Sequence, residues 1–197
     1  MNGQGLALPD DLKALVNSRR RALLGTGLTL SAGAVALLGG RHALAATAKG
    51  GDGEAVVRIL NTALGAELEA IAAYQVGAES GLLSAGIKTV ALQFQGHHKE
   101  HADALAATVA KLGGKAVAAK AKYAFPLEKL KSEQDVLRFA AGLEQGAVSA
   151  YLGAVPVFGD RALAQVAASI LGDEAMHWAV LRQVLAESPV VPKAFMA

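Results

Sequence analysis

The chain has 197 residues, of which 53% are hydrophobic and 5% aromatic. This composition excludes an intrinsically disordered chain and favours alanine-rich packed helices over an all-β fold. Cysteine is absent, which excludes disulfides, thiolate zinc sites, iron–sulfur clusters and thiol catalysis. The formal net charge of +2 is a weak indication of nucleic acid or anionic lipid as a partner, so the position of the charges matters.

The positive charge belongs to the beginning of the chain. Residues 1–45 carry five basic and two acidic side chains, a net charge of +3. The remainder carries 19 − 5 = 14 basic and 17 − 2 = 15 acidic side chains, a net charge of −1. We therefore expect no nucleic-acid partner for the remainder.

The first 48 residues have the order of an export signal: a basic segment, an apolar run and small-residue cleavage sites. The basic segment, Ser18-Arg19-Arg20 with Arg21, resembles the twin-arginine signal of proteins that are exported after folding. We predict cleavage near Ala45 or Ala48, a periplasmic or otherwise exported protein, and contact with the membrane only during export. The alternative is an uncleaved anchor, because residues 22–40 are just long enough to span a bilayer, although five glycines weaken insertion.

The rest of the chain predicts an all-α domain over residues 49–188, followed by a short tail over residues 189–197. Apolar residues recur at helical spacing in four segments, which predict four helices. These cover residues 54–78, 84–112, 132–155 and 161–188. Two short connections flank one crossover of about eighteen residues between the second and third helices. A bundle with one long crossover is typical of ferritin-like folds.

Six ionisable residues occupy positions where the helical pattern requires core side chains. They are Glu67, His98, His101, Glu144, Glu174 and His177. A buried unpaired carboxylate costs several kcal/mol, so six such groups on four helices require a common partner. A pair of metal ions would meet that need, because carboxylates and imidazoles are the ligands of iron, manganese and zinc in such bundles.

An internal repeat supports this metal-site hypothesis. Glu144 follows Glu67 by 77 positions, and each precedes a tyrosine, Tyr151 or Tyr74, by seven. The pair Glu174 and His177 follows the pair His98 and His101 by 76 positions. Residues three apart lie on one face of a helix and can bind one metal site together.

Two segments that contain the three glutamates of this set resemble a known family. The first is Leu60-Asn61-Thr62-Ala63-Leu64, followed by Glu67 and Tyr74. The second runs from Leu143-Glu144-Gln145 to Ala154 and is followed by Glu174-Ala175-Met176-His177. Over about residues 55–186 the chain is similar to exported ferritin-like domain proteins, including the desiccation-related group. The resemblance implies a carboxylate-bridged di-iron site, with Glu67 and Glu144 as single ligands and Glu174 with His177 as a Glu-x-x-His pair.

The chain departs from the family pattern at His98, where a glutamate is usual. The predicted ligand set therefore has three carboxylates and three imidazoles, which leaves less negative charge to stabilise ferric ions. Iron is the first expectation for the cofactor, and a mononuclear site, a mixed pair, or manganese, zinc or copper remain open. Four further side chains are expected to contact the ligands without binding metal. They are Tyr74, Tyr151, His97 and Glu100.

Three functions are compatible with this pattern. The first is an exported redox protein in stress protection, with ferroxidase or peroxidase-like activity and with dioxygen or peroxide as oxidant. The second is a non-enzymatic envelope protein that keeps the bundle as a protective or partner-binding scaffold with a degenerate metal site. The third is a metal store or carrier. An alanine-rich helix face would suit a homodimer.

Overall fold

The computed structural model describes residues 52–191, and the predicted export signal and most of the tail lie outside this range. The described residues form helices only, which confirms the predicted all-α four-helix bundle. The helices are α4 (Asp52–Glu79), α5 (Ala85–Lys111), α6 (Glu133–Ala154) and α7 (Arg161–Val184). Short 3-10 turns, η1 (Leu127–Lys129) and η2 (Val155–Val157), precede and follow α6.

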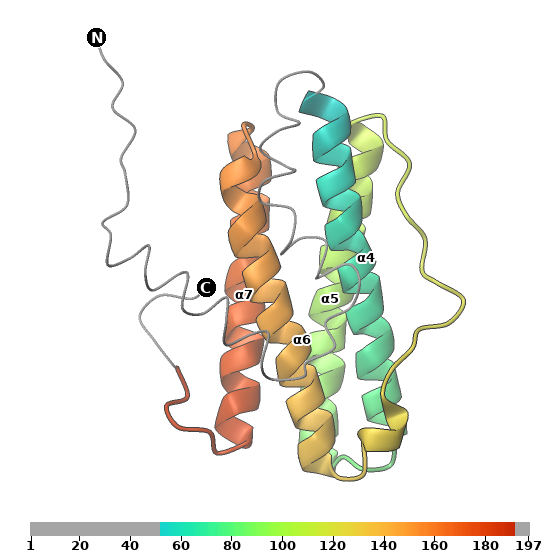
Figure 1. Cartoon of the computed structure of the whole chain (residues 1–197), viewed down its shortest axis with the longest axis vertical. Helices are drawn as coiled ribbons and strands as arrows, with labels where there is room; N and C mark the ends of the chain where they lie inside the picture. The colour runs from blue at the N-terminus through green and yellow to red at the C-terminus, as the bar shows by residue number, and fades with distance from the viewer. Residues whose placement is uncertain (1–51, 192–197) are drawn as a thin grey trace. The chain divides into compact units, whose positions relative to one another are not determined.

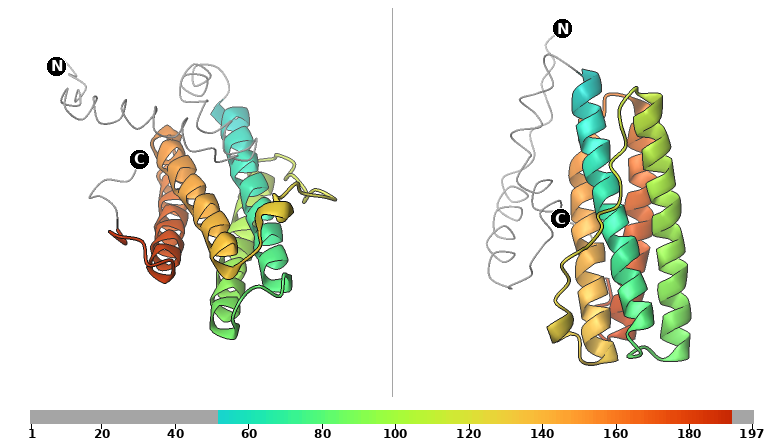
Figure 2. Two further views of the ribbon diagram at one scale, coloured as in Figure 1. Left: turned by 60° about the horizontal axis from the view of Figure 1, so that its bottom comes forward. Right: turned by 90° about the vertical axis from the view of Figure 1, so that its right-hand side faces the viewer.

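The bundle consists of two helix pairs. Helix α4 packs along α5 and α6 packs along α7, and α4 contacts α6 (Figure 1). The crossover from α5 to α6 covers residues 112–132 and runs along the length of the bundle beside α4 (Figure 2). Asn61 on α4 holds this crossover, because its side chain donates to the Lys115 carbonyl and accepts from the Val117 N–H.

Local capping defines where the helices begin and end. Ser132 caps α6 by accepting from the Asp135 N–H, and Asp160 caps α7 by accepting from two backbone N–H groups. Helix α5 ends at Lys111, and Gly113 just beyond it has a φ of +77° that glycine adopts without strain. The next residue, Gly114, must also lack a side chain, because a Cβ atom there would lie 2.6 Å from a methyl carbon of Val57 on α4.

Helix α7 ends at Val184, four residues before the predicted end at 188. Ala186 has a φ of +55°, and the Glu187 N–H reaches back to the Arg182 carbonyl. This is the Schellman ending, which α5 also has, but with alanine where α5 has Gly113. The ending was missed because only glycine and asparagine signal it in a sequence.

We expect Ala186→Gly to stabilise the protein by about 1 kcal/mol, because an alanine in the left-handed region carries roughly that strain. Urea unfolding measures the change. The same substitution at the exposed Ala168, within α7, provides the control and should destabilise the protein by about 1 kcal/mol. A loss of stability at both positions would contradict this account of the helix end.

The apolar core has two parts with polar residues between them. Leu60, Leu64 and Leu105 belong to one buried cluster, and Phe94 and Leu181 belong to the other. On each helix the ionisable residues lie between the positions that contribute to these clusters, so the candidate site is at mid-bundle. No helix within residues 52–191 is long and apolar enough to cross a membrane.

Candidate metal centre

The six predicted ligands come together in the middle of the bundle. Helix α4 supplies Glu67, α5 supplies two histidines, α6 supplies Glu144, and α7 supplies the remaining pair. Every one of the six is at most 8% exposed: Glu67, His98, His101, Glu144, Glu174 and His177. The periodicity that placed them in the core stripe is the reason that four helices direct them to one point.

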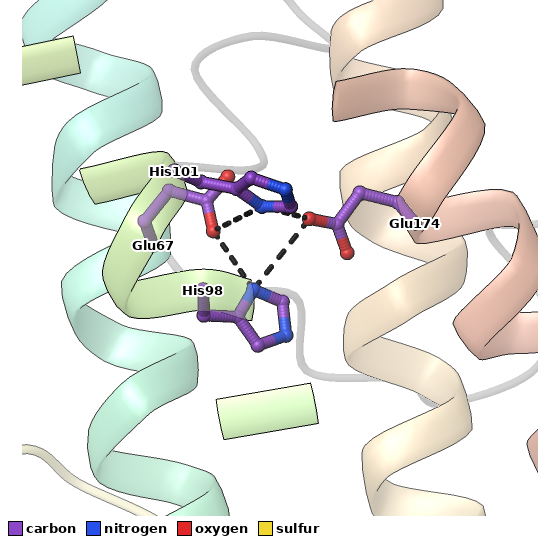
Figure 3. Close-up of side chains that lie close together, drawn as sticks. All are labelled: Glu67, His98, His101 and Glu174. Carbon is purple, nitrogen blue, oxygen red and sulfur yellow. Dashed lines mark hydrogen bonds and ion pairs between the residues drawn. The ribbon is translucent and has the colours of Figure 1, made fainter. Parts of the chain in front are cut away.

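One group of four side chains joins α4, α5 and α7. Nδ1 of His98 lies 2.8 Å from Oε2 of Glu67, and Nδ1 of His101 lies 3.1 Å from Oε1 of Glu174. Nδ1 of His101 also lies 3.6 Å from Oε2 of Glu67. Figure 3 shows these four side chains converging from opposite sides of the bundle. Each offers one ligand atom, and these atoms all lie within 4.8 Å of one another.

A second group of four joins α5, α6 and α7. Nδ1 of His177 lies 3.6 Å from Oε1 of Glu144 and 3.6 Å from Oε2 of Glu174. Nε2 of His98 lies 3.3 Å from Oε1 of Glu144. The two groups share His98 and Glu174. Glu174 directs Oε1 towards the first group and Oε2 towards the second, which is how a bridging carboxylate is arranged.

The unpaired polar atoms of the cluster suit bound metal. Within residues 52–191, five buried atoms have no hydrogen-bond partner: Nδ1 of His101, Nδ1 of His177, Oε2 of Glu144 and both carboxylate oxygens of Glu174. Buried polar atoms without partners are rare in folded proteins, and each one is costly. Oxygen and imidazole nitrogen donors are the ligands of iron, manganese and zinc. The residues therefore fit a metal pair.

In the absence of metal, bound protons neutralise part of the negative charge of the three buried glutamates. Burial alone would lower the pKa of His98, but its contacts with Glu144 and Glu67 prevail and raise this pKa to about 11. In the same way, Glu174 and Glu67 outweigh burial and raise the pKa of His101 to about 10. Burial, reinforced by Glu144, raises the pKa of Glu174 to about 7.

We expect chelator-treated protein to lose thermal stability as pH rises from about 6.5 to about 10. The folded pKa values of His98 and His101 lie above the ordinary histidine pKa of about 6.5. Their stabilising contribution is therefore complete below pH 6.5 and is lost as pH rises through the folded values. Circular dichroism melts measure this loss. His98→Gln should weaken the pH dependence, whereas a melting temperature that rises over this interval would contradict the ion-pair account.

Two tyrosines connect the halves of the bundle through the carboxylates. The Tyr151 hydroxyl on α6 donates to Oε1 of Glu67 on α4, at 2.6 Å. The Tyr74 hydroxyl on α4 donates to Oε1 of Glu144 on α6. Burial and the neighbouring carboxylate raise the pKa of each hydroxyl well above 10, so both remain protonated donors. Each tyrosine thus orients the glutamate of the other helix pair.

The outer nitrogens (Nε2) of His177 and His101 each contact a side chain from the other helix pair. Nε2 of His177 lies 2.8 Å from Nδ1 of His97, and Nε2 of His101 lies 3.2 Å from Oδ2 of Asp173. Contacts of this kind fix the orientation of a metal-binding imidazole. The sequence reasoning missed Asp173, although the repeat offset pointed to it, since 173 − 97 = 76.

Glu100 is the one expected contact that the structure places elsewhere. It lies on the exposed side of α5. A residue two positions from His98 points about 200° away around an α-helix, so its side chain faces away from the ligands.

Comparisons with known proteins agree with this geometry. Residues 55–187 match the ferritin-like domain family. The fold is also similar to the crystal structure of a conserved hypothetical protein, rv2844, from Mycobacterium tuberculosis. The TM-score is 0.63 and the identity 24%, covering 73% of this chain and 99% of that chain. The search of the curated proteins found no match. The chain therefore belongs to the ferritin-like domain family.

Proposed function

We propose that the protein is an exported, ferritin-like redox protein that holds two metal ions, preferably iron, and protects the cell envelope under stress. The observation that carries the proposal is the position of Glu174. Its two unpaired oxygens face the unpaired nitrogens of His101 and His177, so one carboxylate can serve two ions. The twin-arginine route, the relation to desiccation-related proteins and the ferroxidase or peroxidase-like activity are parts of this proposal.

The ligand atoms divide naturally between two ions. Glu67 and His101 would hold one ion together with Oε1 of Glu174, and Glu144 and His177 would hold the other with Oε2. His98 lies between Glu67 and Glu144 and is within reach of both groups. Bound iron would supply reversible one-electron chemistry, with dioxygen or peroxide as the oxidant.

The surrounding side chains would hold this arrangement in place. Tyr74 and Tyr151 each donate a hydrogen bond to one oxygen of Glu144 and of Glu67, respectively. The other oxygen of each glutamate is then available for metal. His97 and Asp173 hold the outer nitrogens of His177 and His101. Burial keeps bulk water away from the six ligands and the two tyrosines, which strengthens the electrostatic interactions among them.

Export after folding suits such a centre. The ligands come from four helices that are far apart in the sequence, so the site forms only when the bundle is complete. A folded protein loaded with metal before transport would keep its ions in the envelope.

If Arg19 and Arg20 are both replaced by lysine in the full chain, we expect the protein to remain in the cytoplasm.

One observation favours a second candidate, a non-enzymatic scaffold with a degenerate metal site. His98 carries a raised pKa and contacts two glutamates, so an imidazolium can neutralise part of the cluster without metal. Such a protein would be stable without ions and would act through its surface.

Metal reconstitution distinguishes the two candidates. The mature protein is reconstituted separately with iron(II), manganese(II), copper(II) and zinc(II), and the bound metal is measured by mass spectrometry. The redox proposal expects two ions per chain, about 3.5–4 Å apart in a metal-loaded structure. Binding should release protons and strengthen as pH rises, because the histidines must lose theirs first. A fold that remains metal-free and unchanged with every ion would support the scaffold and contradict the redox proposal.

A further inference from the structure

An apolar cavity lies beside the metal centre, towards the loop between α4 and α5. All four helices contribute to its lining, including Ala73 and Gly77 on α4 and Ala140 on α6. Tyr74 is the only lining residue with a polar side chain, and its hydroxyl is already donated to Glu144. The side chains of the lining therefore offer a molecule in this cavity no free donor and at most one acceptor, the hydroxyl oxygen of Tyr74.

The cavity shares two walls with the metal centre. Tyr74 contacts Glu144 through its hydroxyl. The Phe94 ring stacks on the imidazole of His177, with 4.1 Å between the ring centroids and 22° between the planes. Both Glu144 and His177 belong to the second ligand group. The contents of the cavity thus lie one aromatic ring away from two candidate ligands.

The cavity is large enough for a small molecule. Its volume is about 30 Å³. A single water needs about 10–15 Å³, so a molecule of two heavy atoms fits. Two lining residues on α7, Val180 and Val184, are each 41% exposed, so small molecules can reach the cavity from outside.

The two oxidants left open by the proposed function differ in how they suit this space. Dioxygen and hydrogen peroxide both have two heavy atoms. Hydrogen peroxide has two O–H donors that lose their partners in water, and the cavity lining offers them at most one side-chain acceptor, so entry is unfavourable. Dioxygen is apolar and loses no hydrogen bonds on entering.

We infer that this cavity takes up dioxygen and supplies it to the metal centre, and that it excludes hydrogen peroxide. The inference rests on the proposed redox function and names its oxidant. In the reaction, two bound iron(II) ions would each give one electron to dioxygen and become iron(III), and the dioxygen would take up two protons and leave as hydrogen peroxide.

Xenon tests the cavity without any metal. Crystals pressurised with xenon are expected to show the gas between Ala91, Phe94 and Tyr74. Ala91→Leu should fill the space and remove the xenon, whereas Ala107→Leu, at an exposed position of the same helix, should leave it. Ala140→Leu fills the cavity from α6 and replaces the first variant if that variant does not fold. Absence of xenon from the unmodified protein would overturn the inference.

Iron oxidation tests the link to the centre. With iron(II) loaded and dioxygen limiting, Ala91→Leu should slow oxidation several-fold, while oxidation by hydrogen peroxide and the amount of bound iron stay unchanged. Two results would contradict the inference and leave the proposed function intact. In one, Ala91→Leu oxidises iron as fast as the unmodified protein with either oxidant. In the other, the substitution slows the reactions with dioxygen and with hydrogen peroxide equally. If no iron binds, the proposed function fails, and the xenon experiment alone then decides whether the cavity holds gas.

Discussion

Replacing Glu174 by glutamine is expected to abolish metal binding at both positions of the centre. The carboxylate is fully buried and its two oxygens face different ligand groups, so its loss affects both ions at once. Glutamine has nearly the same shape but no charge, and its amide nitrogen cannot bind a cation. After reconstitution and dialysis, metal analysis should give two ions per chain for the unmodified protein and none for Glu174→Gln.

Variants on either side of Glu174 sharpen this experiment. His101→Ala and His177→Ala each remove a ligand from one group only, so each should lose one ion and keep the other. Glu100→Gln makes the same chemical change as Glu174→Gln at an exposed position of α5 and should keep both ions. Retention of even one ion by Glu174→Gln would rule out a shared carboxylate. Circular dichroism melts establish that each variant is folded.

The second large effect is expected from His98→Glu, which places a fourth carboxylate in the cluster. Without metal the variant has no imidazole between Glu67 and Glu144, and it buries another acidic group beside them. Disrupting a buried ion pair costs about 3–5 kcal/mol, a large part of the total stability of a domain. With iron bound, the additional carboxylate favours ferric ions. We therefore expect a marked loss of stability without metal and a large gain on adding iron.

Thermal unfolding with and without iron measures both halves of this expectation. The control is His98→Gln, which also removes the imidazole but adds no charge, so iron should restore less of its stability. If His98→Glu is as stable as the unmodified protein without metal, then the histidine does not neutralise the two glutamates. If iron restores no stability to the variant, the cluster is not a metal centre, and the scaffold hypothesis is favoured.

The fold was predictable because its determinants are local. Helical spacing of apolar residues, the Ser132 cap and the left-handed Gly113 all act within a few positions of the chain, and the structure confirms four helices with one long crossover. The convergence of the six ionisable residues could also be anticipated, since each one interrupts an apolar stripe. Their role as metal ligands stays a prediction until metal is measured.

Other features depend on contacts between helices or on unusual backbone conformations. The position of His98 between Glu67 and Glu144 depends on how three helices pack, and so does the cavity near Phe94. Asp173 directly precedes a predicted ligand, and its position in the helical pattern is that of an ordinary acidic residue on the surface. The end of α7 depends on an alanine in the left-handed conformation, and sequence rules expect that conformation at glycine.

The exchange of contacts between the helix pairs has a consequence for how the molecule is assembled. Tyr74 of the first pair donates to the glutamate of the second pair, and Tyr151 of the second pair donates to the glutamate of the first. In the same way, His97 contacts a histidine of the second pair and Asp173 contacts a histidine of the first. This is the reciprocal contact pattern of a two-fold homodimer, here with its subunits joined by the crossover. The tyrosine hydrogen bond to each glutamate comes from the other pair, so these contacts form only when the pairs dock. Two fragments separated by a cut in the crossover are therefore expected to reassociate, each supplying the groups that the other lacks.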